Sequence, residues 1–136
     1  MENAISNEVI LAARLLLAAL YLIFGWRKLM DYPGTVARMV QDGAPFPVVA
    51  TYVAIFMELP VAFAVAVGAF TRPSAVLLAL YTLGASLIAH RYWKVKGPNK
   101  VESMESFYKN LSIMGGFLLL YITGAGKYSI DAVFGM

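Results

Sequence analysis

The sequence predicts an all-α membrane protein, a four-transmembrane-helix bundle with a short interfacial helix between helices 1 and 2. Of its 136 residues, 60% are hydrophobic and 14% are charged, whereas soluble domains average roughly 45–50% and 25%. Four long apolar blocks recur along the chain, and spans of about 20 residues each would occupy most of it. We therefore expect residues 1–136 to form a single transmembrane domain without a separate soluble catalytic domain.

The first predicted span covers residues 9–29. Arg14 is its only charge before the Arg27-Lys28 pair near its end. The stretch from Asp31 to Gly34 contains proline and glycine and should stop the helix. Residues 35–43 follow, with apolar side chains at helical spacing, which predicts a short helix at the membrane surface.

The three remaining spans are predicted at residues 47–70, 73–90 and 107–126. A tight turn separates the second from the third, so these two should be antiparallel neighbours, and Pro73 suits a first helical turn. The basic and polar segment at 91–106 is expected to be a surface loop. The fourth span is of marginal length, because only 17 uncharged residues separate Lys109 from Lys127.

The distribution of basic residues predicts the orientation of the bundle. Of the 11 Lys and Arg residues, 8 lie in the first and third predicted loops or at their edges. These are Arg27, Lys28, Arg38, Arg91, Lys94, Lys96, Lys100 and Lys109. Because basic residues favour the cytoplasmic side, both chain termini are expected on the non-cytoplasmic side.

The composition excludes several kinds of chemistry. The chain contains no cysteine, which rules out disulfide exchange and thiolate-ligated metal sites or clusters. His90 is the only histidine, and no spacing resembles a metal site, a phosphate-binding loop or a nucleophile elbow. We therefore predict no metal site, no nucleic-acid partner and no cofactor bound by this chain alone, with quinone as the one candidate ligand.

Glu58 is the most informative single position, because a carboxylate deep in a membrane is costly unless it is paired or protonated. Pro60 follows two residues later and should kink the helix beside the acid. The Arg14 side chain is long enough to reach the depth of Glu58 in the membrane, so an Arg14–Glu58 ion pair is one interpretation. A functional carboxylate at an ion or proton site is the second, and snorkelling of both side chains to the surface is the third.

A second polar group is predicted at the cytoplasmic ends of the helices, as a quinone or proton site. Its members are Lys28, His90, Trp93, Lys109 and Asn110. Similar depth is what places them together, and Trp93 lies three residues after His90 on one helix face. The alternative is that His90 is an ordinary interfacial residue bonded to water or lipid.

Motifs spread over nearly the whole chain resemble those of the DoxX family of small bacterial and archaeal membrane proteins. They are Arg14 with Phe24-Gly25-Trp26-Arg27-Lys28-Leu29, Gly43 with Pro45, Met57-Glu58-Leu59, Gly68 with Thr71-Arg72, His90 with Trp93, Lys109-Asn110-Leu111 with Gly115-Gly116, and the closing segment Gly124 to Asp131. The resemblance implies a four-helix membrane bundle in the inner (plasma) membrane of a bacterium or archaeon. It also implies a redox setting, because the family takes its name from subunits of a thiosulfate:quinone oxidoreductase.

Three functional hypotheses follow from the resemblance and the polar residues. The first is an accessory subunit of a quinone-linked membrane oxidoreductase or other redox complex, which contributes at most part of a quinone site. The second is a structural or assembly subunit of a larger membrane complex, without chemistry of its own. The third is a small proton-linked carrier that uses Glu58. Other membrane subunits or further copies of the chain are the expected partners, together with the lipid bilayer.

Overall fold

A computed structural model of the chain describes residues 4–135, with side chains from Ser6 onward, and this part contains helices and no β-strand. The elements in order are α1 (Ala4–Met30), α2 (Tyr32–Gln41), α3 (Pro47–Phe56), the π-helix η1 (Met57–Val61), α4 (Ala62–Val67), α5 (Thr71–Ala89), the 3-10 helix η2 (Tyr92–Lys94), α6 (Asn99–Thr123) and α7 (Ile130–Val133). Predominantly helical structure is therefore confirmed.

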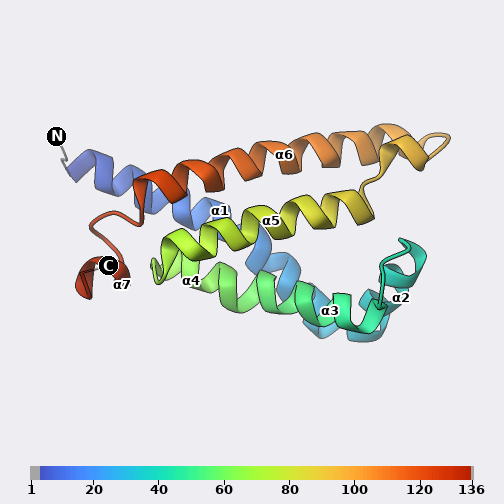
Figure 1. Cartoon of the computed structure of the whole chain (residues 1–136), viewed down its shortest axis with the longest axis horizontal. Coiled ribbons are helices and arrows are strands. Elements are labelled where there is room, and N and C mark those ends of the chain that lie inside the picture. The colour runs from blue at the N-terminus through green and yellow to red at the C-terminus, as the bar shows by residue number, and fades with distance from the viewer. Residues whose placement is uncertain (1–3, 136) are drawn as a thin grey trace.

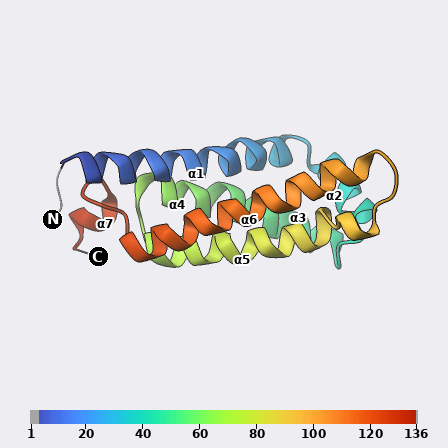
Figure 2. The same ribbon diagram turned by 90° about the horizontal axis from the view of Figure 1, so that it is seen from above.

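The long helices form an elongated bundle, in which α3, η1 and α4 join into one continuous rod (Figure 1). Helices α5 and α6 run antiparallel and pack closely along each other, while α1 crosses the bundle obliquely (Figures 1 and 2). The start of α1, the α4–α5 turn and α7 lie at one end, which we call the tail end. Helix α2 and the α5–α6 connection lie at the other, which we call the basic end.

Three helical segments are long and apolar enough to cross a membrane, namely Ser6–Met30, Pro47–Val67 and Thr71–Lys94. They correspond to the first three predicted spans. Helix α6 is less apolar, because its first half carries Lys100, Glu102, Glu105 and Lys109.

Two helix boundaries differ from those predicted. The short helix begins at Tyr32, because the Asp31 side chain caps it by accepting a hydrogen bond from the Gly34 amide at 3.2 Å. Helix α6 begins at Asn99, so the second half of the segment predicted as a loop is helical. Charged residues are compatible with a helix that extends beyond the apolar part of the bundle.

The bundle interior is small and mainly apolar, with Ala18, Val65 and Leu78 fully buried between the helices. Phe117 from α6 is also fully buried, and its ring lies 5.7 Å from that of Tyr21 on α1. The outer surface is strongly apolar. Several large hydrophobic side chains on it are each more than half exposed, namely Leu16, Phe63, Leu80 and Ile122. A membrane protein shows this pattern, because lipid rather than water covers its surface.

Candidate functional site

Glu58 lies on η1 in the middle of the bundle, where it is only 5% exposed. The Lys28 ammonium on α1 donates to Oε1 at 2.8 Å and forms an ion pair with the carboxylate. The Tyr81 hydroxyl on α5 donates to Oε2. We call these residues the Lys28–Glu58–Tyr81 cluster. Through the Glu58 side chain, it connects helices α1, η1 and α5.

The backbone at Glu58 is shaped by Pro60, which has no amide hydrogen to donate to the carbonyl of Phe56. The helix widens at this point into the π-helical turn Met57–Val61. Turns of this kind inside α-helices are rare and frequently occur at functional sites. The predicted disturbance beside the acid is therefore present, and it takes the form of a π-helical turn.

Gly25 allows α1 to approach this turn closely. A Cβ atom at position 25 would lie 2.8 Å from the Glu58 Cβ and 2.9 Å from the Leu59 Cγ, closer than side chains tolerate. Glycine at this position therefore sets the distance between α1 and η1, and with it the reach of Lys28 to Glu58.

Gly25→Ala should separate α1 from η1 and destabilise the protein, because helix backbone lies on the opposite side of the contact and cannot yield easily. Gly115→Ala is the matched control, since nothing lies within 4 Å of a Cβ there. Replacing a helical glycine by alanine without a clash stabilises by up to about 1 kcal/mol. Thermal unfolding in detergent should show a lower midpoint for Gly25→Ala and an unchanged or higher one for Gly115→Ala. Equal midpoints would contradict the close approach.

A line of polar side chains continues from this cluster between α1, α5 and α6. The Tyr21 hydroxyl and Thr82 Oγ1 are 2.5 Å apart, and Ser86 Oγ donates to the Thr82 carbonyl at 2.8 Å. Asn110 Nδ2 on α6 donates to Ser86 Oγ at 2.9 Å. Each of these groups therefore has a hydrogen-bond partner inside the bundle, as buried polar atoms require.

Arg14 does not reach Glu58, which corrects one of the predicted pairings. The Arg14 guanidinium is 1% exposed and lies near the tail end, where it donates to the carbonyls of Ala125 at 2.5 Å, Tyr128 at 2.7 Å and Ala66 at 3.4 Å. The C-terminal segment folds back over the bundle and presents the carbonyls of Ala125 and Tyr128, and α4 presents that of Ala66. Lys28 occupies the partner position at Glu58 instead.

Asp131 completes the tail end. Its carboxylate accepts hydrogen bonds from the amides of Phe70 at 2.7 Å and Thr71 at 2.8 Å, which caps the first turn of α5. Its own amide donates to the Gly68 carbonyl at 2.8 Å. Gly68 has φ +73, and a Cβ there would lie 2.4 Å from the Ser129 Cβ, so the turn and the C-terminal segment fit only around glycine. Arg14 and Asp131 thus fasten this segment from two sides.

The five residues predicted as a quinone or proton site do not form one hydrogen-bonded group. Lys28 binds Glu58, and Asn110 binds Ser86. His90 follows the end of α5 within electrostatic reach of Asp42 and Lys28. In the described part of the chain, no hydrogen bond or ion pair joins any two of the five.

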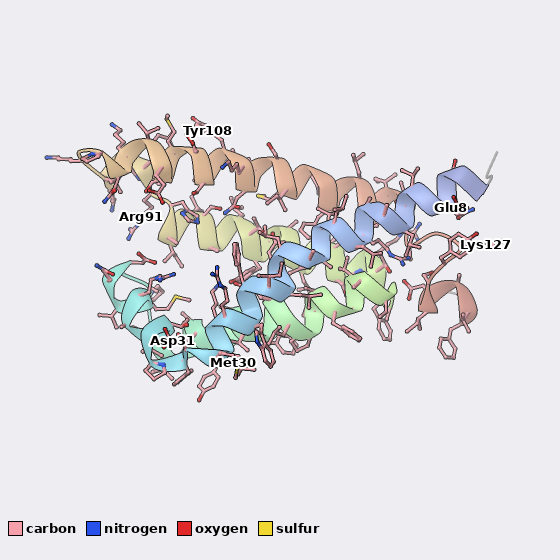
Figure 3. All side chains as sticks on the ribbon, turned by 180° about the vertical axis from the view of Figure 1, so that it is seen from behind. Glu8, Met30, Asp31, Arg91, Tyr108 and Lys127 are labelled. Atoms are coloured by element: carbon pink, nitrogen blue, oxygen red, sulfur yellow. The ribbon has the colours of Figure 1, made fainter. Side chains whose placement is uncertain are left out.

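The remaining two members lie at the basic end. Trp93 packs in an aromatic cluster, with its ring 5.2 Å from that of Tyr92 and 5.5 Å from that of Phe107. Lys109 lies on the exposed face of α6, beside Tyr108, which Figure 3 labels near Arg91. The predicted group is therefore divided, since only Lys28 and His90 are within electrostatic reach of each other, whereas Asn110 bonds Ser86 and Trp93 and Lys109 have other neighbours.

The α2–α3 connection is also fixed at this end. The Arg91 guanidinium donates to the main-chain carbonyl of Asp42 at 2.7 Å. Burial raises the pKa of the Asp42 carboxyl above its ordinary value, and the nearby basic groups of Arg38, His90 and Arg91 oppose this shift.

Tyr81 and Tyr21 are the functional candidates that sequence reasoning missed. Both hydroxyls lie within apolar spans, and a phenol in such a position needs a hydrogen-bond partner. This requirement for a hydrogen-bond partner was the signal that the sequence offered. The partners themselves could not be assigned, because the depth of a residue in the membrane does not show how its helix is rotated about its axis.

Comparison with known proteins places this site in a family. The family model described as DoxX matches residues 9–91, more than half of the chain. The chain belongs to the DoxX family. The DoxX match includes the whole Lys28–Glu58–Tyr81 cluster and Arg14.

Two curated relatives share most of the length of this DoxX-family chain. It is 46% identical over 123 residues to inner membrane protein YphA of Escherichia coli, covering 90% of this chain and 88% of that protein. It is 38% identical over 125 residues to inner membrane protein YqjF of the same bacterium, with the same coverage. A shorter match, 35% over 66 residues, covers 48% of this chain and 21% of the ER-derived vesicles protein ERV29 of Saccharomyces cerevisiae. No solved structure matches the chain.

Proposed function

We propose that this DoxX-family protein is an accessory subunit of a quinone-linked oxidoreductase in the bacterial inner membrane, and that its Lys28–Glu58–Tyr81 cluster exchanges protons for that reaction. One observation carries the proposal, namely a buried carboxylate that accepts from an ammonium and a phenol inside the bundle. A carboxylate in this position is by default a candidate for a functional residue, with its partner Lys28 named.

The chemistry of the cluster suits proton exchange. Glu58 supplies the acceptor, and Lys28 compensates its charge while it is ionised. When Glu58 takes up a proton, Lys28, which is 29% exposed, can turn towards the surface. Reduction of a quinone to a quinol consumes electrons and protons in equal number, so a proton-exchanging group in the membrane serves such a reaction.

The electrons must come from a partner subunit. The 136 residues contain no cysteine and one histidine, so they offer few side chains that could hold a redox centre. The accessory role is supported by these properties together with membership of the DoxX family. Quinone remains the proposed ligand, shared between this chain and its partner.

We further propose that α6 is the fourth transmembrane span and that the basic end faces the cytoplasm. Residues 110–126 carry no charge, and α6 packs along α5, which is itself a candidate span. The exposed side chains Leu119 and Ile122 are 68% and 71% accessible, which suits contact with lipid. The names of the two bacterial relatives support location in the inner membrane.

Gentle extraction from native membranes tests the accessory role. The protein should co-purify with a cofactor-bearing subunit and with quinone, detected by mass spectrometry and by an absorption spectrum. Glu58→Gln should retain the partner but slow quinone reduction about 100-fold or more, because general acid–base catalysis contributes roughly 100-fold at the low end of its range. Glu8→Gln is a matched control, because Glu8 is exposed at the tail end (Figure 3). A protein that runs alone without quinone or pigment would rule the proposal out.

A proton-linked carrier is the second candidate, and the π-helical turn beside Glu58 is the observation in its favour. Widened helix backbone beside an acid suits a site that opens alternately to the two sides. In reconstituted vesicles, Glu58→Gln should then abolish proton-coupled flux while the folded fraction stays unchanged. Absence of flux in the parent protein would eliminate this candidate.

A further inference from the structure

A shallow groove of about 340 Å³ lies on one face of α6 at the basic end. Its lining residues are Met104, Glu105, Tyr108, Lys109 and Ser112. All five residues belong to α6, so the groove is open along one face of this helix. The groove therefore combines one carboxylate, one ammonium and two hydroxyls with an apolar floor, and none of these residues takes part in the proposed proton exchange.

Both charges in the groove are available to a ligand. Glu105 and Lys109 stand one helical turn apart, in the order that favours an ion pair along a helix. They do not form such a pair in the structure. Within residues 4–135, the ion pair observed is the one between Lys28 and Glu58. Glu105 and Lys109 are both exposed. Their charged ends therefore remain unneutralised, one helical turn apart along the groove.

The groove lies at the level of an aromatic belt. Tyr92, Trp93, Phe107 and Tyr108 pack together there, and the Tyr92 and Tyr108 hydroxyls are 3.1 Å apart. Tryptophan and tyrosine favour the boundary between lipid headgroups and hydrocarbon. The uncharged part of α6 starts at Asn110, immediately beyond the groove. A phospholipid headgroup at this level would have its acyl chains directed along α6.

The same helix face provides a path for such a chain. Ser112, Gly115 and Leu119 follow Tyr108 at spacings that keep them on one side of α6. Gly115 has no atom within 4 Å of a Cβ position, so the surface is open there. Leu119 is 68% exposed and offers apolar contact below it.

We propose that the groove binds a zwitterionic phospholipid with a primary ammonium, such as phosphatidylethanolamine. Lys109 contacts the phosphate, Glu105 accepts hydrogen bonds from the ammonium, and one acyl chain lies over Ser112, Gly115 and Leu119. Complementary charge carries the choice of headgroup. A choline group has no N–H to donate to Glu105, and an anionic headgroup places a negative charge beside that carboxylate without an ammonium to offset it.

Native mass spectrometry of the delipidated full-length protein in mild detergent tests the proposal. The protein is titrated with phosphatidylethanolamine, phosphatidylcholine and phosphatidylglycerol that carry identical acyl chains. Phosphatidylethanolamine should bind about tenfold more tightly than either of the others, as expected for one hydrogen bond to a charged group. Glu105→Gln should remove this preference and Lys109→Met should weaken all three lipids. Lys100→Met is the matched control and should change nothing, because Lys100 points away from Lys109 around the helix.

Three outcomes would overturn the proposal. Equal binding of all three lipids would show a non-specific surface. Tightest binding of phosphatidylglycerol would show simple attraction of anionic lipid to the lysines. A mass of two chains that is lost in Lys109→Met would show a second copy in the groove. Circular dichroism of each variant should match the parent, which separates lost binding from lost folding.

Discussion

Lys28→Met should destabilise the protein by about 3–5 kcal/mol, the cost of leaving a buried charge without its partner. Glu58 is 5% exposed, and after the substitution only the Tyr81 hydroxyl would still donate to its carboxylate. The free energy of unfolding, measured by denaturant titration in mixed micelles, should fall by this amount. Lys100→Met is the control with a similar loss of charge at an exposed position, and it should leave stability nearly unchanged.

The double variant Lys28→Met/Glu58→Leu should recover most of the lost stability, because both charges leave the interior together. Such recovery would show that the two side chains interact in the folded protein. Additive losses would contradict the ion pair. The same double variant addresses the structural hypothesis, since a purely structural subunit should keep its function once its stability returns.

Arg14→Met should release the C-terminal segment at the tail end. The guanidinium donates to three main-chain carbonyls, those of Ala66, Ala125 and Tyr128, and none can regain a partner from methionine. Each buried polar group left unsatisfied costs about 1–3 kcal/mol. The expected loss is therefore several kcal/mol, and cleavage by trypsin after Lys127 should become much faster.

Arg72→Met is the matched control at the same end. Arg72 is exposed and bonds the carbonyl of Tyr121 at 2.9 Å, near the last turn of α6. Its replacement should cost about 1 kcal/mol, because water can satisfy the freed carbonyl. If both variants were cleaved equally slowly, Arg14 would not be holding the segment. Arg14→Lys should fall between the two, since one ammonium cannot match the several donors of a guanidinium.

The sequence predicted the helical segments well because apolar runs and breakers are local features. Residues 73–90 were expected to be helical and lie within one helix, apart from the last residue. The start of α6 was missed, although the breaker at Gly97 and Pro98 directly precedes Asn99. Charged residues after that breaker favoured a loop in the prediction, yet charge decides whether a helix enters lipid and does not decide whether it forms.

The contacts of the site were predicted less well, because they depend on helix rotation. Arg14 and Glu58 were paired by depth alone, and depth does not say which face of α1 meets η1. The structure brings Gly25 against Glu58, so the face that includes Lys28 meets the acid while Arg14 faces the C-terminal segment. The position of that segment depends on long-range contacts, such as Asp131 at the start of α5, which no local pattern predicts.

Infrared spectroscopy of the protein in lipid tests most directly the central claim that Glu58 exchanges protons. Difference spectra between the protein with oxidised quinone and the same protein with quinol should contain a carboxylic acid C=O band that disappears in Glu58→Gln. The band should move to higher frequency in Tyr81→Phe, because the hydroxyl that donates to Oε2 is lost. A spectrum without any band that depends on Glu58 would contradict the account and would leave Lys28 and Glu58 as a permanent structural ion pair.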